Sequence, residues 1–248
     1  MTSDATAHAV LTWLRTRLRQ GIRTMRFPPS RDGVDFPERF RGRPVWSSDL
    51  GACLFSPEEG GYSRDYRMAT STREALVSRT GELELARALD ERTRKLFRRS
   101  LRLRSVVAGS CNGCEAELVA LGNVVFDLAR FGVQFVASPR HADGIVVTGA
   151  VNRNMRRALE LTYEAVPPPK IVIAVGACAI SGGPFRDSPE VNAGVGGILP
   201  VDLWVPGCPP HPLTTLDGLL RLLGVIERRE QRSVAVAPES KDTLTTPS

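Results

Sequence analysis

The sequence predicts an α/β protein, with an open, mostly parallel sheet, helices on both faces and an irregular N-terminal extension. Two observations predict this fold class. From Leu103 onward, short apolar runs of strand length alternate with segments of helical periodicity, which is the pattern of βαβ units. Before residue 100, little regular alternation is present. A chain of 248 residues with 42% apolar content can build one such core and an appendage.

The first hundred residues divide into three segments. Residues 5–20 predict a short basic amphipathic helix, because Val10, Leu14 and Leu18 are spaced by four. Residues 21–70 are rich in Pro, Gly and Arg and predict an extended arm, ordered only where something covers it. Residues 71–100 return to helical spacing. In that helix we expect Thr72 as N-cap and one apolar stripe formed by Leu76, Leu83, Leu89 and Leu96.

The rest of the chain supplies the elements of the sheet. Strands are expected at 103–108, 133–137, 144–148, 170–175 and 201–205. Helices are expected at 115–130, 152–166 and 211–223. The run at 170–175 is almost continuously β-branched, as in a strand buried on both faces. We therefore expect a basic extension over 1–100, an α/β domain over 101–231 and a disordered tail over 232–248.

Charge is distributed unevenly between the two halves. Residues 1–104 carry 21 Lys and Arg against 13 Asp and Glu, whereas residues 105–248 carry 12 against 14. The arginines come without a recognisable nucleic-acid motif or aromatic stacking platforms, so we expect no nucleic-acid partner. An acidic partner subunit and an anionic membrane surface explain the asymmetry equally well. Without a signal peptide or an apolar stretch of membrane-spanning length, we expect a cytoplasmic, reduced protein.

Four cysteines, each placed just after a predicted strand, are the candidate functional residues. Cys111 and Cys114 read S-C-N-G-C, Cys178 reads G-A-C, and Cys208 reads P-G-C-P-P. In open parallel sheets ligands bind outside the carboxyl ends of the strands, so three loops distant in sequence are expected to present thiolates to one volume. The nearby glycines permit close approach of the backbone. The pattern predicts a metal centre with four thiolate ligands.

The spacing favours an iron–sulfur cluster over three alternatives. Zinc sites with four cysteines usually offer two C-x-x-C pairs, whereas this chain has one pair followed by two single cysteines. A zinc site and unliganded, buried cysteines remain open on spacing alone. A C-x-x-C redox dithiol also fits locally but leaves Cys178 and Cys208 unexplained.

The sequence around these cysteines resembles that of a known family. The matching stretches are 109–115 (G-S-C-N-G-C-E), 138–143 (S-P-R-H-A-D), 148–151 (T-G-A-V), 176–183 and 201–210. Residues 109–224 resemble the small, cluster-bearing subunit shared by complex I and the membrane-bound, energy-converting NiFe hydrogenases, including formate hydrogenlyase. The expected sheet is then flavodoxin-like. The resemblance implies one 4Fe–4S cluster bound by Cys111, Cys114, Cys178 and Cys208.

The resemblance also implies a function and partners. Complex I subunits carry adjacent cysteines at the first pair, whereas hydrogenase-type subunits have C-x-x-C, as here. We expect an electron-transfer subunit, not catalytic alone, which lies next to the catalytic centre of a NiFe-hydrogenase-like large subunit. A ferredoxin-like iron–sulfur subunit and membrane subunits complete the complex and hold the chain peripherally at the membrane. The alternatives are a complex I-like quinone oxidoreductase and a non-catalytic zinc or apo scaffold of the same fold.

Four further residues have two possible interpretations or a simple structural one. Glu115 follows a ligand and opens a helix, where it interacts with the helix dipole or takes part in proton-coupled chemistry. Arg140 and His141 either form a surface turn or donate hydrogen bonds near the cluster. Residues 25–29 and 36–44 faintly resemble the opening of the two-cluster ferredoxin-like subunit, but where a cysteine run would follow, Cys53 stands alone. We interpret Cys53 as a plain thiol and the arm as a docking extension.

Overall fold

A five-stranded parallel sheet organises the computed structural model, which describes residues 3–29, 36–44, 48–52, 61–78, 83–97, 100–226 and 228. Its strands are β3 (Leu101–Val107), β4 (Val133–Phe135), β5 (Gly144–Thr148), β6 (Ile171–Val175) and β7 (Leu203–Val205). Their spatial order is β4-β3-β5-β6-β7, and every neighbouring pair is parallel. This is the flavodoxin-like order, in which the chain reverses direction across the sheet after its first two strands. The predicted fold class is confirmed.

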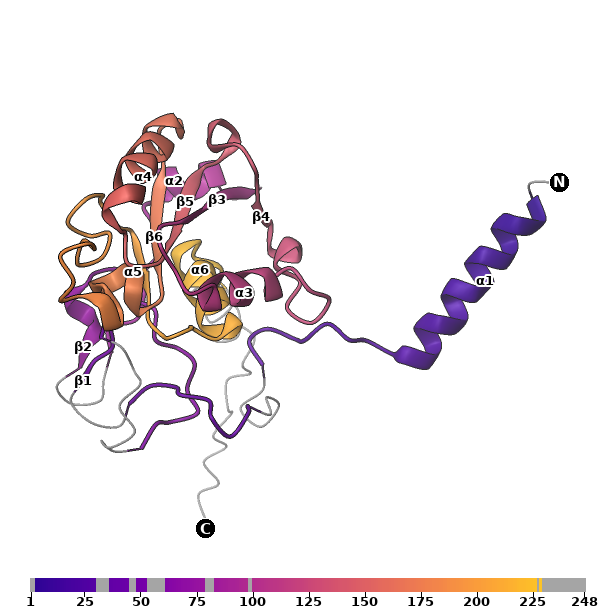
Figure 1. Cartoon of the computed structure of the whole chain (residues 1–248). Coiled ribbons are helices and arrows are strands. Elements are labelled where there is room, and N and C mark those ends of the chain that lie inside the picture. The colour runs from indigo at the N-terminus through magenta and orange to yellow at the C-terminus, as the bar shows by residue number, and fades with distance from the viewer. Residues whose placement is uncertain are drawn as a thin grey trace, which may run out of the picture.

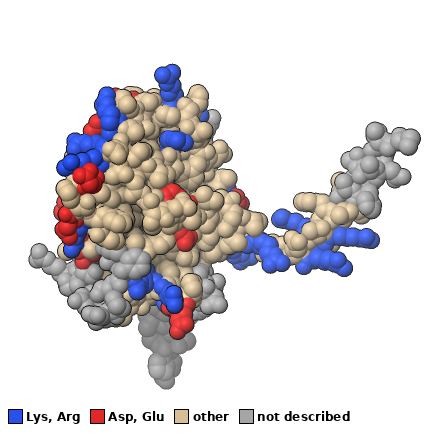
Figure 2. Space-filling model, viewed as in Figure 1, with Lys and Arg blue, Asp and Glu red and all other residues tan. Residues whose placement is uncertain are grey.

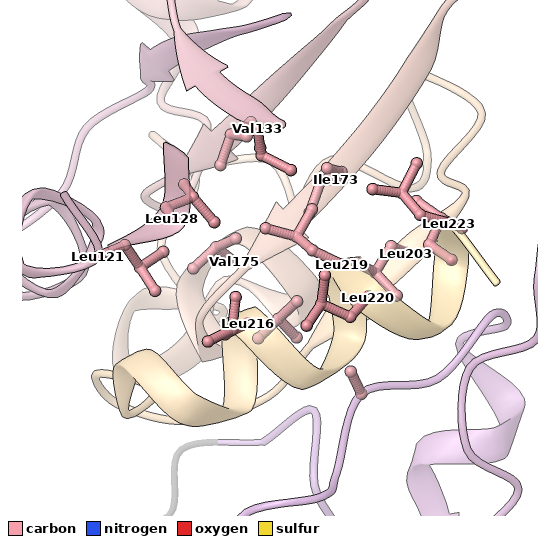
Figure 3. Close-up of a cluster of buried hydrophobic side chains, with 14 of the residues drawn as sticks. Leu121, Leu128, Val133, Ile173, Val175, Leu203, Leu216, Leu219, Leu220 and Leu223 are labelled. Carbon is pink, nitrogen blue, oxygen red and sulfur yellow. The ribbon is translucent and has the colours of Figure 1, made fainter. Parts of the chain in front are cut away.

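Helices cover both faces of the sheet (Figure 1). The helices α3 (Gly113–Ala120) and α6 (Pro212–Leu222) pack on one face, and α4 (Arg153–Ala165) and α5 (Ala177–Ser181) pack on the other. Alternate residues of each strand enter the two cores, so Ile173 belongs to one and Val172 to the other. In Figure 3, α6 directs Leu216 and Leu219 toward Val175 of β6. Burial on both sides explains the apolar runs of β5 and β6.

Local signals place α4 where the sequence predicts it. The Asn152 side chain accepts a hydrogen bond from the backbone N–H of Met155 at 2.9 Å and so caps the first turn. The helix ends at Ala165, just before the three prolines. The five predicted strands and the helix over 211–223 are likewise found, with ends shifted by two residues or fewer.

The predicted helix over 115–130 is wrong in its second half, because α3 ends at Ala120. The Asn123 side chain accepts hydrogen bonds from the N–H groups of Val125 (2.8 Å) and Phe126 (3.1 Å). Such a side-chain turn competes with helical bonding. Asp127 then takes a left-handed conformation, with φ of 47°, and a short 3-10 helix follows at Leu128–Phe131.

The predicted helix over 71–100 is also largely wrong. A 3-10 turn spans Glu74–Leu76, β2 spans Val77–Ser78, and the only α-helix among the described residues of this segment is α2 (Glu91–Phe97). The backbone between them bonds to distant partners, since Ala86 N–H donates to Ala69 and Leu89 N–H donates to Leu222. The expected leucine stripe does not form. Thr72 nevertheless accepts a hydrogen bond from Ala75 N–H at 3.3 Å.

Part of the N-terminal extension belongs to the core. Leu50, Met68, Ala69 and Leu76 are fully buried or nearly so. Thr70 exchanges two backbone hydrogen bonds with Trp204, at 2.9 and 3.0 Å, and so lies antiparallel beside β7. A two-stranded ribbon of β1 (Ser48–Asp49) and β2 lies next to this segment and is closed by two hydrogen bonds from Arg73 to Asp49. Residues of the arm thus complete the sheet edge and the core beneath it.

The first helix lies outside the packed core of the protein. Helix α1 (Ser3–Gln20) projects from the body on an extended segment (Figure 1). Every residue from 10 to 20 is exposed. No helix in the described ranges is both long and apolar enough to cross a membrane. Cys53 and the predicted tail over 232–248 lie outside the described residues.

Candidate metal centre

The carboxyl ends of four strands lie level at one edge of the sheet. Val107 pairs with Thr148, Thr148 with Val175, and Val175 with Val205. The four predicted cysteines follow three of these ends within a few residues. The topology therefore brings three loops, separated by up to about a hundred residues of chain, to one side of the molecule.

Each cysteine has a distinct place on that edge. Cys111 lies in the loop after β3 and is exposed, whereas Cys114 lies in the first turn of α3 and is buried. Cys178 is the second residue of α5, and Cys208 lies in the loop between β7 and α6, and both are partly buried. Between the first two, Asn112 adopts a left-handed conformation with φ of 70°, which turns the chain into α3.

Glycine lets two of the sulfur atoms approach the loops. Gly176 has φ of +89°, and a Cβ at this position would lie 2.5 Å from the Sγ of Cys114. A Cβ at Gly183 would lie 3.0 Å from the Sγ of Cys178. The Cys114 sulfur therefore sits against the loop that carries Cys178, in space that any side chain at residue 176 would fill.

The four thiols share one electrostatic environment. Burial raises the pKa of the Cys114 thiol, and negative charge on Glu115, Cys178, Cys208 and Cys111 raises that pKa further. Negative charge around the buried Cys114 thiol favours a cationic centre there, because a coordinated metal removes the proton from its thiol ligand. The donor chemistry and the glycine-lined loops fit an iron–sulfur centre.

Among the described residues, the four thiols do not converge on one point. Within the part of the chain that the structure describes, no three His, Cys, Asp or Glu side chains lie close enough together to hold one metal ion. A 4Fe–4S cluster takes its four thiolates at separate irons, so its ligands do not need to meet at one point.

Two carboxylates stand near this edge. Both side-chain oxygens of Glu115 are buried without a hydrogen-bond partner among the described residues. Glu117 is half-buried, and burial raises the pKa of its carboxyl group. Glu115 was predicted from its position after Cys114, whereas nothing in the sequence singles out Glu117.

Arg140 and His141 lie elsewhere. They belong to the 3-10 helix Pro139–His141, are exposed, and precede Gly144 at the amino end of β5. Gly144 pairs with Leu103, whereas the cysteine loops follow the level of Val107. Four residues of strand span about 13 Å. The structure therefore does not bring Arg140 and His141 to the edge that carries the cysteines.

A cavity of about 500 Å³ lies beside Cys208, and no sequence pattern predicts it. The arm covers one side of it with residues 37 and 39–41, and Glu117 and His211 line the other. The His211 ring packs edge-on against Phe36 and Phe40, at centroid distances of 5.3 and 5.4 Å. Burial lowers the pKa of His211 to about 4. No spacing in the sequence connects residues 36–40 with residue 211, so only the fold reveals this contact.

The part of the chain that contains these cysteines matches a known protein family. The family described as "NADH ubiquinone oxidoreductase, 20 Kd subunit" matches residues 111–222. The chain is 46% identical to formate hydrogenlyase subunit 7 of Escherichia coli K12 over 135 residues, which are 54% of this chain and 53% of that protein. The match thus spans about half the length of that relative.

Two further relatives carry names from both branches of the family. Identity is 49% with the probable membrane-bound hydrogenase subunit mbhJ of Pyrococcus furiosus, over 48% of this chain and 71% of that protein. It is 48% with an NADH-quinone oxidoreductase subunit of Heliobacterium modesticaldum, over 46% of this chain and 66% of that protein. Among solved structures, the archaeal membrane-bound sulfane sulfur reductase complex contains a chain 34% identical over 57% of this one and 78% of its own length, with a TM-score of 0.48.

Proposed function

The chain belongs to the family of the NADH ubiquinone oxidoreductase 20 kDa subunit, and on that premise we propose that it is an electron-transfer subunit holding one 4Fe–4S cluster. The observation that carries the proposal is the meeting of three strand-end loops, with four thiols, at one edge of a parallel sheet. By name, the relatives are subunits of a formate hydrogenlyase, a membrane-bound hydrogenase and an NADH-quinone oxidoreductase. The chain contributes to oxidoreductase activity as one subunit.

Cys111, Cys114, Cys178 and Cys208 would be the ligands. A 4Fe–4S cluster held there supplies the uptake and release of single electrons. The protein's own part is to fix the thiols on rigid strand ends and to bury Cys114 while leaving Cys111 at the surface. An exposed ligand on one side of a buried one gives a partner close access to the centre.

Within the family, we propose a membrane-associated NiFe hydrogenase complex of the formate hydrogenlyase type. The C-x-x-C spacing of Cys111 and Cys114 supports that branch, as the resemblance of the sequence implies. The catalytic centre would belong to a partner large subunit, and a ferredoxin-like subunit would exchange electrons with this chain. The chain is 48% identical to an NADH-quinone oxidoreductase subunit and 49% identical to the hydrogenase subunit mbhJ. These nearly equal identities support a complex I-like assembly as the second candidate.

Metal and sulfide analysis tests the cluster. We expect the anaerobically purified full chain to be brown, to contain about four irons and four sulfides, and to show an EPR signal after dithionite reduction. Cys111→Ser and Cys178→Ser should lose most of the iron, whereas Cys53→Ser should retain it. A colourless protein with stoichiometric zinc would contradict the proposal.

Nickel analysis tests the choice between the two assemblies. We expect the complex purified through this chain from its native host to contain a large subunit with bound nickel and to oxidise or evolve H2. A complex that retains the iron–sulfur signal but contains no nickel would support the complex I-like alternative and reject the hydrogenase assignment.

A further inference from the structure

Within the described ranges, the hydrogen bonds that fix the region of helix α1 to the body of the protein lie in the segment that follows the helix. Met25 N–H donates a hydrogen bond to the Val125 carbonyl at 2.9 Å, and Arg130 donates one to the Met25 carbonyl at 2.6 Å. Phe27 packs edge-on against Phe131 at 5.9 Å. The base of the helix is therefore fixed on the loop after α3, while the helix itself extends into solvent (Figure 1).

The exposed helix carries a broad apolar face. Val10, Leu14 and Leu18 follow one line along the helix because they are spaced by four. Leu11 and Trp13 lie on the two flanks of that line. Together with Ile22, these side chains are 43–83% exposed. A set of large apolar side chains this exposed on one helix marks a surface that another phase or molecule covers.

The same stretch is strongly cationic. Residues 10–26 contain no Asp or Glu and five arginines, at positions 15, 17, 19, 23 and 26. Arg15 follows Leu11 by four residues and borders that flank, whereas Arg17, four residues after Trp13, lies between Trp13 and the line of Val10, Leu14 and Leu18. Figure 2 shows the Lys and Arg side chains gathered along the described part of the helix and the segment after it. Their long stems can reach from an apolar surface to charged groups above it.

The surface continues onto the body of the protein. Trp13, Arg17 and Ile22 line a cavity of about 190 Å³ together with Val124 from the loop after α3. Val124 is itself exposed. The side of α1 that lines this cavity, with Trp13, Thr16, Arg17 and Gln20, is therefore next to the line of Val10, Leu14 and Leu18 and leaves that line uncovered.

We propose that α1 lies flat on an anionic lipid surface, with Trp13, Leu14 and Leu18 among the acyl chains and Arg15, Arg17 and Arg19 on the lipid phosphates. The charge of the stretch, five arginines without an acidic residue, complements anionic headgroups. Tryptophan at the boundary of an apolar face is typical of the membrane–water interface. The chain thus makes its own contact with the membrane, in addition to any through partner subunits. This inference does not depend on the cluster.

Vesicle binding tests the proposal with the full-length chain. We expect the chain to sediment with vesicles of phosphatidylcholine and phosphatidylglycerol in equal parts, and far less with phosphatidylcholine alone. High salt should release it. Replacing Arg15, Arg17 and Arg19 by Gln should weaken partitioning roughly 100-fold, since each basic residue near an anionic surface contributes a factor of about five.

Matched variants separate lipid binding from a protein partner. Replacing the same three arginines by Lys should retain binding, Thr16→Ala should leave it unchanged, and Leu14→Gln with Leu18→Gln should abolish most of it. Failure of the wild-type chain to bind anionic vesicles would overturn the proposal. So would a triple Gln variant that binds vesicles like the wild type yet no longer co-purifies with its partner subunits, because α1 would then dock on protein.

Discussion

Gly176 controls how closely two of the cysteine loops approach. Its φ of +89° lies in the region that other residues rarely adopt, and its missing side chain leaves room for the Cys114 sulfur. Backbone strain of this kind costs roughly 1–3 kcal/mol for a residue with a Cβ. The geometry of the proposed ligand set thus depends on one residue that provides no ligand itself.

Gly176→Ala is expected to disturb the centre more than the fold. The new Cβ would lie 2.5 Å from the Cys114 Sγ, so that sulfur must move. We expect iron content to fall at least several-fold while far-UV circular dichroism stays close to wild type. Gly197→Ala is the matched control, since nothing lies within 4 Å of a Cβ at that position. Full iron in the Gly176 variant would show that the Cys114 sulfur is not held there.

His211 makes stability depend on pH. Burial lowers its pKa from 6.5 to about 4 in the folded chain, so between these values the unfolded chain binds a proton that the folded chain does not. Stability from this residue is present above about pH 6.5 and is lost as the pH falls toward 4. The shift bounds the loss at about 3 kcal/mol, and because the ring is partly exposed we expect about 1–2 kcal/mol.

Urea unfolding at about pH 7 and about pH 5 measures this loss. The Nδ1 of His211 accepts a hydrogen bond from the Leu213 N–H at 3.2 Å. His211→Asn is the control, because asparagine keeps an acceptor for that N–H but does not titrate. We expect the decrease in stability between the two pH values to be smaller in the variant. Equal decreases in both proteins would assign the pH dependence to other groups.

At the scale of single elements, the boundaries that follow local signals are the ones the sequence predicts. Helix α4 begins after a capping asparagine and ends before three prolines. The segment 71–90 has leucines at helical spacing, but its N–H groups bond to Ala69, Ser71 and Leu222. Partners so distant in sequence leave no periodic trace, and the helix prediction failed there for that reason.

Asn152→Ala is expected to weaken α4. Loss of the bond from Met155 N–H should lower the free energy of unfolding by about 1 kcal/mol, or the melting temperature by roughly 2–4 °C. Asn152→Asp keeps an acceptor at this position and adds a negative charge at the helix N-terminus, so it should melt close to wild type. Differential scanning fluorimetry compares the three proteins. An alanine variant as stable as wild type would show that the cap contributes nothing.

At the scale of the whole molecule, the sheet and the cysteine edge follow from sequence patterns, while the contacts of the arm do not. Strand-end cysteines predict a shared edge because parallel strands align their carboxyl ends. Nothing in the sequence pairs Thr70 with Trp204 or Phe36 with His211, since Thr70 and Phe36 lie in irregular segments with no periodicity. The N-terminal extension therefore has two different parts, the exposed helix α1 and a segment that packs in the core.

Two truncations are expected to separate these parts. Removal of residues 1–20 takes away side chains that are exposed throughout the described part of α1, so the melting temperature should stay within about 1 °C. Removal of residues 1–100 also takes away Leu50, Met68 and Leu76, whose burial contributes roughly 1.5–3 kcal/mol each. That loss approaches the whole stability of a typical domain, about 5–15 kcal/mol.

Thermal melting of the two truncated chains measures the difference. The short truncation serves as the control for loss of N-terminal residues in general. Cooperative melting of the chain that begins at Leu101, at the temperature of the full chain, would contradict a structural role for residues 49–76.

The pairing of Thr70 with Trp204 also has a consequence for the protein in concentrated solution. β7 is the last strand of the parallel sheet, and its three residues are apolar and buried. An uncovered strand of this kind is a template for strand addition from another chain. Thr70 occupies both backbone groups of Trp204, and so blocks self-association through that edge. Light scattering of a Thr70→Pro variant, which lacks the donating N–H, should therefore reveal oligomers that the wild-type chain does not form.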